Sequence, residues 1–193
     1  MTEEDAGRSP ESAGRPEAAR RVVVLCLGNA FRGDDAIGVR AASELRKHVV
    51  PDVAIVVQER EPTSLLEVWD GADLVIVVDA VRAGGRPGTL VRRELGRGPL
   101  PRSARPTSSH GLGLAEIVSL AGVLGRLPRR MIVWGCETKS FDIGTGPSTP
   151  VLAALPAIVK GVLGDLGAFA ASADREEREA TEEHEAREEL DDA

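Results

Sequence analysis

Four short apolar runs, each rich in β-branched residues, constrain the fold of this chain more than any other feature of its sequence. Nearly continuous apolar runs of this length are typical of strands that are covered on both faces. Segments with apolar residues at helical spacing separate the runs, so strands and helices alternate along the chain. The runs are RVVVLCLG (21–28), VAIVVQE (53–59), DLVIVVDAV (73–81) and RRMIVWGCE (129–137).

This alternation predicts an α/β fold of three layers, a twisted, mainly parallel sheet of about five strands flanked by helices on both faces. A fifth strand is expected within residues 85–95, where a Pro-Gly turn precedes an alternating segment typical of an edge strand. The length of 193 residues and 42% apolar composition predict one domain, over residues 20–168. Residues 1–19 are expected to form a disordered N-terminal arm, and residues 169–193 an acidic tail that is disordered or a frayed helix.

The net charge of −7 is unevenly placed, since residues 174–193 hold 11 Asp and Glu against three Arg. Aromatic residues are only 3% of the chain and follow no basic stripe, which argues against nucleic-acid binding. The longest uninterrupted apolar run is far shorter than the ~20 residues of a membrane span, so no membrane insertion is expected. Cys26 and Cys136 lie far apart in apolar runs, which predicts buried, reduced thiols and a cytoplasmic protein.

A glycine-rich turn, GNAFRGDDAIGVR (28–40), follows the first apolar run and opens a helix. Such turns usually bind phosphate through backbone N–H groups. This one lacks the Lys-Ser/Thr pair of a P-loop and the Gly spacing of a dinucleotide fingerprint. It ends instead in Asp34 and Asp35, whose charge favours a cation or a role in proton transfer.

Further polar residues follow the other predicted strands, at the edge where ligands bind in open α/β sheets. Asp79 ends the third run, His110 precedes the third long helix, and Glu137 ends the last run. Two carboxylates and an imidazole that converge from separate strands would suit a divalent first-row metal with open positions for substrate.

Each of these residues also has a structural interpretation. Asp34 and Asp35 are acids at the start of a helix, which they would stabilise as caps or through the helix dipole. His110 could cap its own helix, and Arg32 could be either a surface charge or a substrate contact. Asp79 favours a role at a site, because an isolated buried carboxylate is costly without a partner.

Four segments of the chain together resemble the hydrogenase maturation proteases, in the same order and at similar spacings. The most specific are the LGN-x-x-x-x-DD turn and the His-Gly-Leu-Gly-Leu-Ala segment, and the resemblance extends over residues 21–164. The matching segments are residues 23–45, 75–81, 108–121 and 133–159.

This resemblance implies an endopeptidase that removes the C-terminal extension from the large-subunit precursor of a nickel-iron hydrogenase after nickel insertion. The family's metal-binding residues fall on Asp35, Asp79 and His110 of this sequence. We expect them to bind nickel that the precursor carries; a resident catalytic metal is the alternative. The bound metal would polarise the scissile carbonyl or activate water, with Asp35 or Asp34 as the catalytic base.

Substrate contacts are predicted for Arg32, Asn29 and Glu137, and the protein is expected to act as a monomer. Three other functions stay open. The first is a non-catalytic checkpoint protein or chaperone that binds the nickel site of the precursor, and the second is an anion- or nucleotide-binding module. The third is a hydrolase using Ser108 or Ser109 with His110, which is disfavoured because adjacent side chains rarely point the same way.

Overall fold

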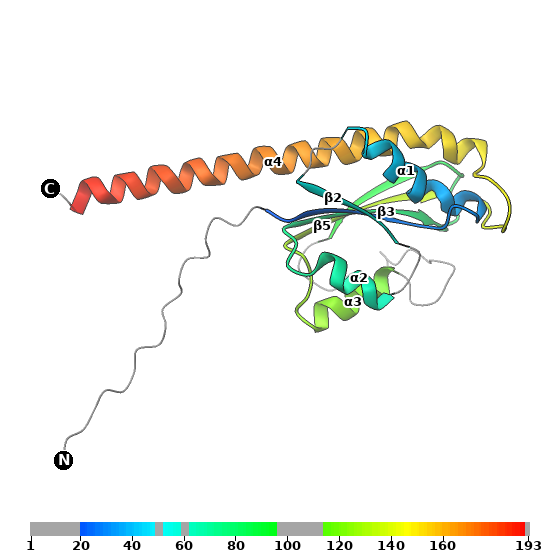
Figure 1. Cartoon of the computed structure of the whole chain (residues 1–193), viewed down its shortest axis with the longest axis horizontal. Helices are drawn as coiled ribbons and strands as arrows, with labels where there is room; N and C mark the ends of the chain where they lie inside the picture. Colours follow the sequence, from blue (N-terminus) through cyan, green and yellow to red (C-terminus); the bar gives the residue numbers. More distant parts are fainter. Residues whose placement is uncertain (1–19, 49–51, 59–61, 96–113, 192–193) are drawn as a thin grey trace, which may run out of the picture.

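The computed structural model describes residues 20–48, 52–58, 62–95 and 114–191, and its centre is a five-stranded sheet in the order β2-β1-β3-β5-β4 (Figure 1). Four strands are parallel, and the edge strand β4 pairs with β5 in the antiparallel sense. The predicted mainly parallel sheet and its edge strand are therefore confirmed. The strands are β1 (Val22–Leu27), β2 (Val53–Gln58), β3 (Leu74–Val81), β4 (Leu90–Leu95) and β5 (Arg130–Glu137).

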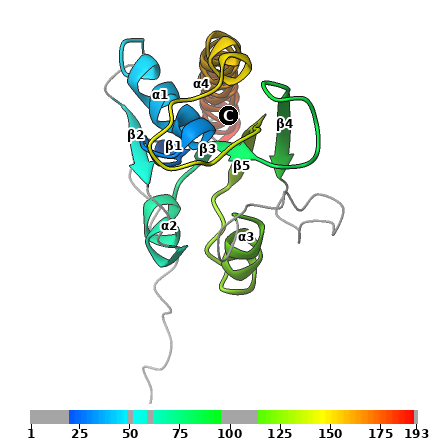
Figure 2. The same cartoon turned by 90° about the vertical axis from the view of Figure 1, so that its right-hand side faces the viewer.

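Helices cover both faces of the sheet, as the apolar runs require (Figure 2). One face packs against α1 (Ile37–Leu45) and α4 (Thr149–Asp191), and the other against α2 (Pro62–Trp69) and α3 (Leu114–Val123). A short 3-10 helix, η1 (Gly33–Ala36), leads into α1. The predicted three-layer α/β architecture is confirmed.

Side chains alternate between two hydrophobic cores because successive residues of a strand point to opposite faces. In β3, Ile76 and Val78 enter the core under α1 and α4, whereas Val75 and Val77 enter the core over α2 and α3. Both cores are completed from β1 and β5, so the three central strands are buried on both faces. This arrangement fixes which face each residue at the carboxyl ends of these strands occupies.

The last helix, α4, runs without interruption past the expected boundary at 168 to Asp191, and Ala173 is still buried. Its final turns project beyond the sheet (Figure 1). By length and composition alone the segment Thr149–Glu179 could cross a membrane, a test that core helices of soluble proteins also pass. Here one face of α4 packs on the sheet through residues such as Ile158 and Val162.

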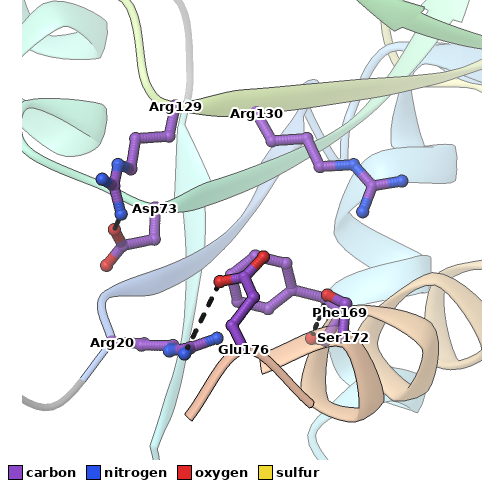
Figure 3. A pocket seen from close by; sticks show the side chains of 7 residues that line it. All are labelled: Arg20, Asp73, Arg129, Arg130, Phe169, Ser172 and Glu176. Carbon is purple, nitrogen blue, oxygen red and sulfur yellow. Dashed lines mark hydrogen bonds and ion pairs between the residues drawn. The ribbon is translucent and has the colours of Figure 1, made fainter. Parts of the chain in front are cut away.

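Paired charges fasten the outer part of α4 to the amino ends of the strands, around a cavity of about 330 Å³ (Figure 3). Arg20 donates to the carbonyl of Ala173 at 3.1 Å and pairs with Glu177 at 3.0 Å. Arg129 pairs with Asp73 at 3.5 Å on the strand side of the same cavity. The contacts of Arg20 therefore anchor the helix, whereas the Arg129–Asp73 pair joins the segments before β5 and β3.

Replacing Arg20 with glutamine is expected to loosen α4 beyond Ala173 while leaving the domain folded. Exposed ion pairs contribute only about 0–1 kcal/mol, so the melting temperature should change little. Local hydrogen exchange over residues 174–191 should accelerate by up to about fivefold, which corresponds to that energy. Arg126→Gln, which removes the exposed pair with Asp70, is the control. Equal exchange in both variants would show that Arg20 does not anchor the helix.

Candidate active site

Two glycines allow the predicted turn to pack tightly at the carboxyl end of β1. Gly28 has φ +141°, and a Cβ there would lie 2.0 Å from the carbonyl oxygen of Asp35. A Cβ at Gly38, in the first turn of α1, would lie 2.0 Å from the carbonyl oxygen of Leu27. No side chain fits at either position. The glycines therefore serve close packing of backbone on backbone, consistent with the missing phosphate motifs.

Asp35 is held inside this turn with only 1% of its surface exposed. Its Oδ2 atom accepts a hydrogen bond from the backbone N–H of Asn29 at 2.8 Å, and its own N–H donates to the carbonyl of Arg32 at 3.0 Å. The side chain of Asn29 accepts the N–H of Phe31 at 2.8 Å. The carboxylate is thus fixed in place by a turn that folds around it.

Asp34, also 1% exposed, has a different environment. It accepts backbone N–H groups from Lys139 at 2.8 Å, Ser140 at 3.2 Å and Ser148 at 2.6 Å. Burial by itself would raise the pKa of Asp34, but these hydrogen bonds, that from Ser148 foremost, lower it overall. Neither η1 nor α1 has a side-chain cap, so the structural role is to tie the loop 139–148 to the turn.

Asp79 lies in β3 beside the turn that holds Asp35. It follows Val75 and Val77 at the two-residue period of a strand, which places it on the face covered by α2 and α3. It pairs in register with Gly135 of β5, and η1 contacts β3. The fold therefore brings the two acids to the carboxyl edge of the adjacent strands β1 and β3.

The third predicted metal ligand, His110, lies outside the described residues, as do Ser108 and Ser109. Within the residues that the structure describes, no three His, Cys, Asp or Glu side chains are grouped so as to hold a metal ion. The predicted metal triad therefore stays a prediction, with two of its members placed at one edge of the sheet.

The predicted substrate contacts take part in local structure. The buried carboxylate of Glu137 accepts the N–H groups of Ala83 and Gly84 through Oε1, both at 2.9 Å. These hydrogen bonds fix the turn after β3. Arg32 pairs through its backbone with Ile143 in an isolated antiparallel bridge. A direct contact of Asn29, Arg32 or Glu137 with substrate stays a prediction. Their observed contacts shape the carboxyl edge of the sheet.

Both cysteines are buried and free, as predicted. Burial raises the pKa of Cys26 to about 12. Burial also raises that of Cys136 to about 11, with a further contribution from the charges of Asp34 and Glu137. Thiols with such values carry almost no thiolate at neutral pH, so neither is a nucleophile.

Sequence reasoning missed the loop 139–148 as the partner of Asp34. The three donors are backbone groups that lie 105 to 114 residues away along the chain, and any residue but proline offers one. The residue types at these positions therefore do not indicate that their N–H groups bind Asp34. Gly38, inside a predicted helix, is a signal of close packing between α1 and β1 and gives no information about the partner of Asp34.

A sequence model described as hydrogenase maturation protease matches residues 39–165. The chain belongs to the hydrogenase maturation protease family. This membership confirms the family resemblance and makes the protein a hydrolase of the endopeptidase class.

Relatives within the family match most of the domain. The hydrogenase expression/formation protein HupD of Bradyrhizobium diazoefficiens is 35% identical over 132 residues, which are 67% of this chain and 69% of that protein. The hydrogenase 2 maturation protease of Escherichia coli is 30% identical over 138 residues, which are 70% of this chain and 83% of that protein.

Solved structures of maturation proteases share the fold. The hydrogenase maturating endopeptidase HybD from E. coli matches with a TM-score of 0.68 and 27% identity, covering 77% of this chain and 93% of that one. The [NiFe] hydrogenase maturation protease HycI from Thermococcus kodakarensis matches with a TM-score of 0.57 and 27% identity, covering 76% and 92%.

Proposed function

We propose that this maturation protease removes the C-terminal extension of a nickel-iron hydrogenase large-subunit precursor once nickel has been inserted. The observation that carries the proposal is the placement of Asp35 and Asp79 at one edge of adjacent parallel strands, within a family of maturation proteases. A buried carboxylate held in a rigid turn keeps its geometry while substrate binds. We further propose that cleavage takes place in the cytoplasm and that the enzyme acts as a monomer.

In this proposal the precursor's nickel is part of the substrate, and Asp35, Asp79 and His110 supply its additional ligands. Carboxylate oxygens and imidazole nitrogens suit a divalent first-row metal. The metal would polarise the scissile carbonyl, and a water molecule would add to the carbonyl carbon before the peptide bond breaks. A precursor without nickel would lack the metal ion through which these side chains position it, so cleavage would depend on metal insertion.

Asp35 is the better of the two proposed catalytic bases. The lowered pKa of Asp34 makes it a weak proton acceptor, and its oxygens already accept three N–H groups. Asp35 accepts the N–H of Asn29 at 2.8 Å through Oδ2 and lies on the side of the turn next to Gly28. One carboxylate cannot bind the metal and accept a proton in the same step. We therefore propose that Asp35 binds the nickel first and acts as the base in a later step.

The test is to mix the purified protein with nickel-loaded and nickel-free precursor and to weigh the products by mass spectrometry. Loss of a short C-terminal peptide from the nickel-loaded precursor alone is expected. Metal-dependent binding without cleavage would favour the checkpoint alternative. Equal cleavage of both forms would overturn nickel recognition while leaving the protease activity in place.

Removal of residues 174–193 is expected to leave the cleavage rate within about twofold of wild type. Residues 174–191 extend beyond the buried Ala173 from the amino ends of the strands, where Arg20 contacts α4 (Figure 1). Asp35 belongs to η1, at the carboxyl end of β1. The lost ion pairs of Arg20 are exposed and contribute little to stability. Steady-state cleavage by the truncated and full chains gives the comparison. A large rise in KM for the truncated chain would make the helix end a docking element.

A further inference from the structure

Two large apolar side chains stand exposed next to the turn that holds Asp35. Phe31 is 74% exposed and Ile143 is 80% exposed. They belong to two loops that pair backbone to backbone, since the N–H of Gly144 donates to the carbonyl of Phe31 at 2.8 Å and Arg32 bridges to Ile143. Phe31 and Ile143 therefore belong to two loops that backbone pairing holds together, and we call these two exposed side chains the apolar rim.

The apolar rim is rigid on its Phe31 side. The N–H of Phe31 donates to the side chain of Asn29 at 2.8 Å, and the N–H of Arg32 donates to the carbonyl of Asn29 at 3.2 Å. Asn29 is also the donor to the carboxylate of Asp35. Phe31 is thus displayed by the same turn that fixes the proposed ligand.

The Ile143 side of the rim is equally well held. Thr145 donates through its hydroxyl to the carbonyl of Asp142 at 2.8 Å, and its own carbonyl accepts the N–H of Gly33 at 3.0 Å. At the base of this loop, Asp34 accepts the N–H groups of Ser140 and Ser148. A backbone that is already held in this way loses little conformational freedom when a partner covers it, which lowers the entropic cost of binding.

We propose that Phe31 and Ile143 form the surface on which the precursor packs an apolar segment beside its scissile bond. This inference rests on the proposed function. Phe31 and Asp35 belong to the same turn, so a polypeptide whose peptide bond is bound at Asp35 passes close to Phe31, the large apolar side chain that this turn exposes. Substrate choice by this enzyme would then depend on apolar residues next to the cut as well as on nickel.

Kinetics of cleavage by the full-length variants Phe31→Ser and Ile143→Ser test the inference. Each is expected to raise KM for the nickel-loaded precursor several-fold with kcat nearly unchanged, and the double variant by about tenfold or more. Phe31→Leu should keep a KM close to that of wild type. Val123→Ser is the matched control, because Val123 is 85% exposed on α3, away from this edge. Unchanged melting temperatures would show that the fold is intact.

Two results would overturn the inference. One is a KM for Phe31→Ser and Ile143→Ser equal to that of Val123→Ser. The other is a wild-type dimer in size-exclusion chromatography that Phe31→Ser dissociates, because a second copy would then be the occupant of the rim. If wild type does not cleave at all, the proposed function fails by itself. Affinity of the same variants for nickel-loaded precursor then decides the inference, with a tenfold loss expected in the double variant.

Discussion

Asp79→Asn is expected to abolish cleavage of the nickel-loaded precursor while the protein stays folded. Asparagine has nearly the shape of aspartate but loses the negative charge that makes the carboxylate a strong ligand for a divalent cation. Substitutions of residues that merely orient metal ligands cost about 10–100-fold, so loss of a ligand should cost more than about 100-fold. The measurement is the initial rate of peptide release, followed by mass spectrometry.

The matched control for this substitution is Asp73→Asn. Asp73 stands immediately before β3, at the opposite end of the strand that carries Asp79, and its partners are Arg21 and Arg129. This variant is expected to cleave at a rate close to wild type. His110→Ala should resemble Asp79→Asn, since both remove a proposed ligand. Full cleavage by either one, at wild-type nickel loading of the precursor, would refute the proposed nickel-binding set.

The second large effect is expected from Asp34→Ala, which should lower the free energy of unfolding by about 3 kcal/mol. The substitution leaves the N–H groups of Lys139, Ser140 and Ser148 without their charged acceptor, and hydrogen bonds to charged groups contribute about 1.5–3 kcal/mol each, partly recovered by water. Urea unfolding measures the change. Asp142→Ala, an exposed acid of the same loop, is the control.

The contribution of Asp34 also predicts a dependence of stability on pH. The pKa of Asp34 is lower in the folded chain than its ordinary value of 3.8, because three N–H groups stabilise the charged form. The folded state therefore gains stability that is complete well above pH 3.8 and is lost as the pH falls through the folded pKa. Unfolding between pH 7 and pH 2 should show a smaller loss in Asp34→Ala than in wild type. Parallel losses in both proteins would contradict this assignment.

Asp34→Asn separates a structural role from a catalytic one. The amide would place a donor against backbone donors, so stability should fall, but the folded fraction should still cleave if Asp35 is the reacting carboxylate. A folded Asp34→Asn variant without activity would show that Asp34 has a catalytic role.

Much of the fold was predictable because the strands of a doubly covered parallel sheet are apolar on both faces. The run at β3 is buried from Leu74 to Val78, and the Pro-Gly turn before β4 correctly marks the edge strand. The length of α4 was not predictable from an apolar stripe, since residues 174–191 have none. Their Glu, Ala and Arg residues are good helix formers, and propensity extends the helix where packing ends.

The candidate site was predictable in part. Carboxyl ends of neighbouring parallel strands meet at one edge, so Asp35 and Asp79 could be brought together from sequence. The internal partners of Asp34 and Glu137 could not, because both acids bind backbone N–H groups of segments that are distant in sequence or lie in an irregular turn. A carboxylate that the sequence suggests for ligand binding can instead accept hydrogen bonds from the backbone of its own fold.

The way Asp34 binds its loop also bears on how this enzyme can change during evolution. Its three partners are main-chain groups, so every residue except proline satisfies them at positions 139, 140 and 148. Exposed side chains between them, such as Ile143, can diverge without moving Asp35. A new precursor could therefore be accommodated by point substitutions on a backbone that stays constant, while an insertion or deletion in the same loop would disturb the site itself.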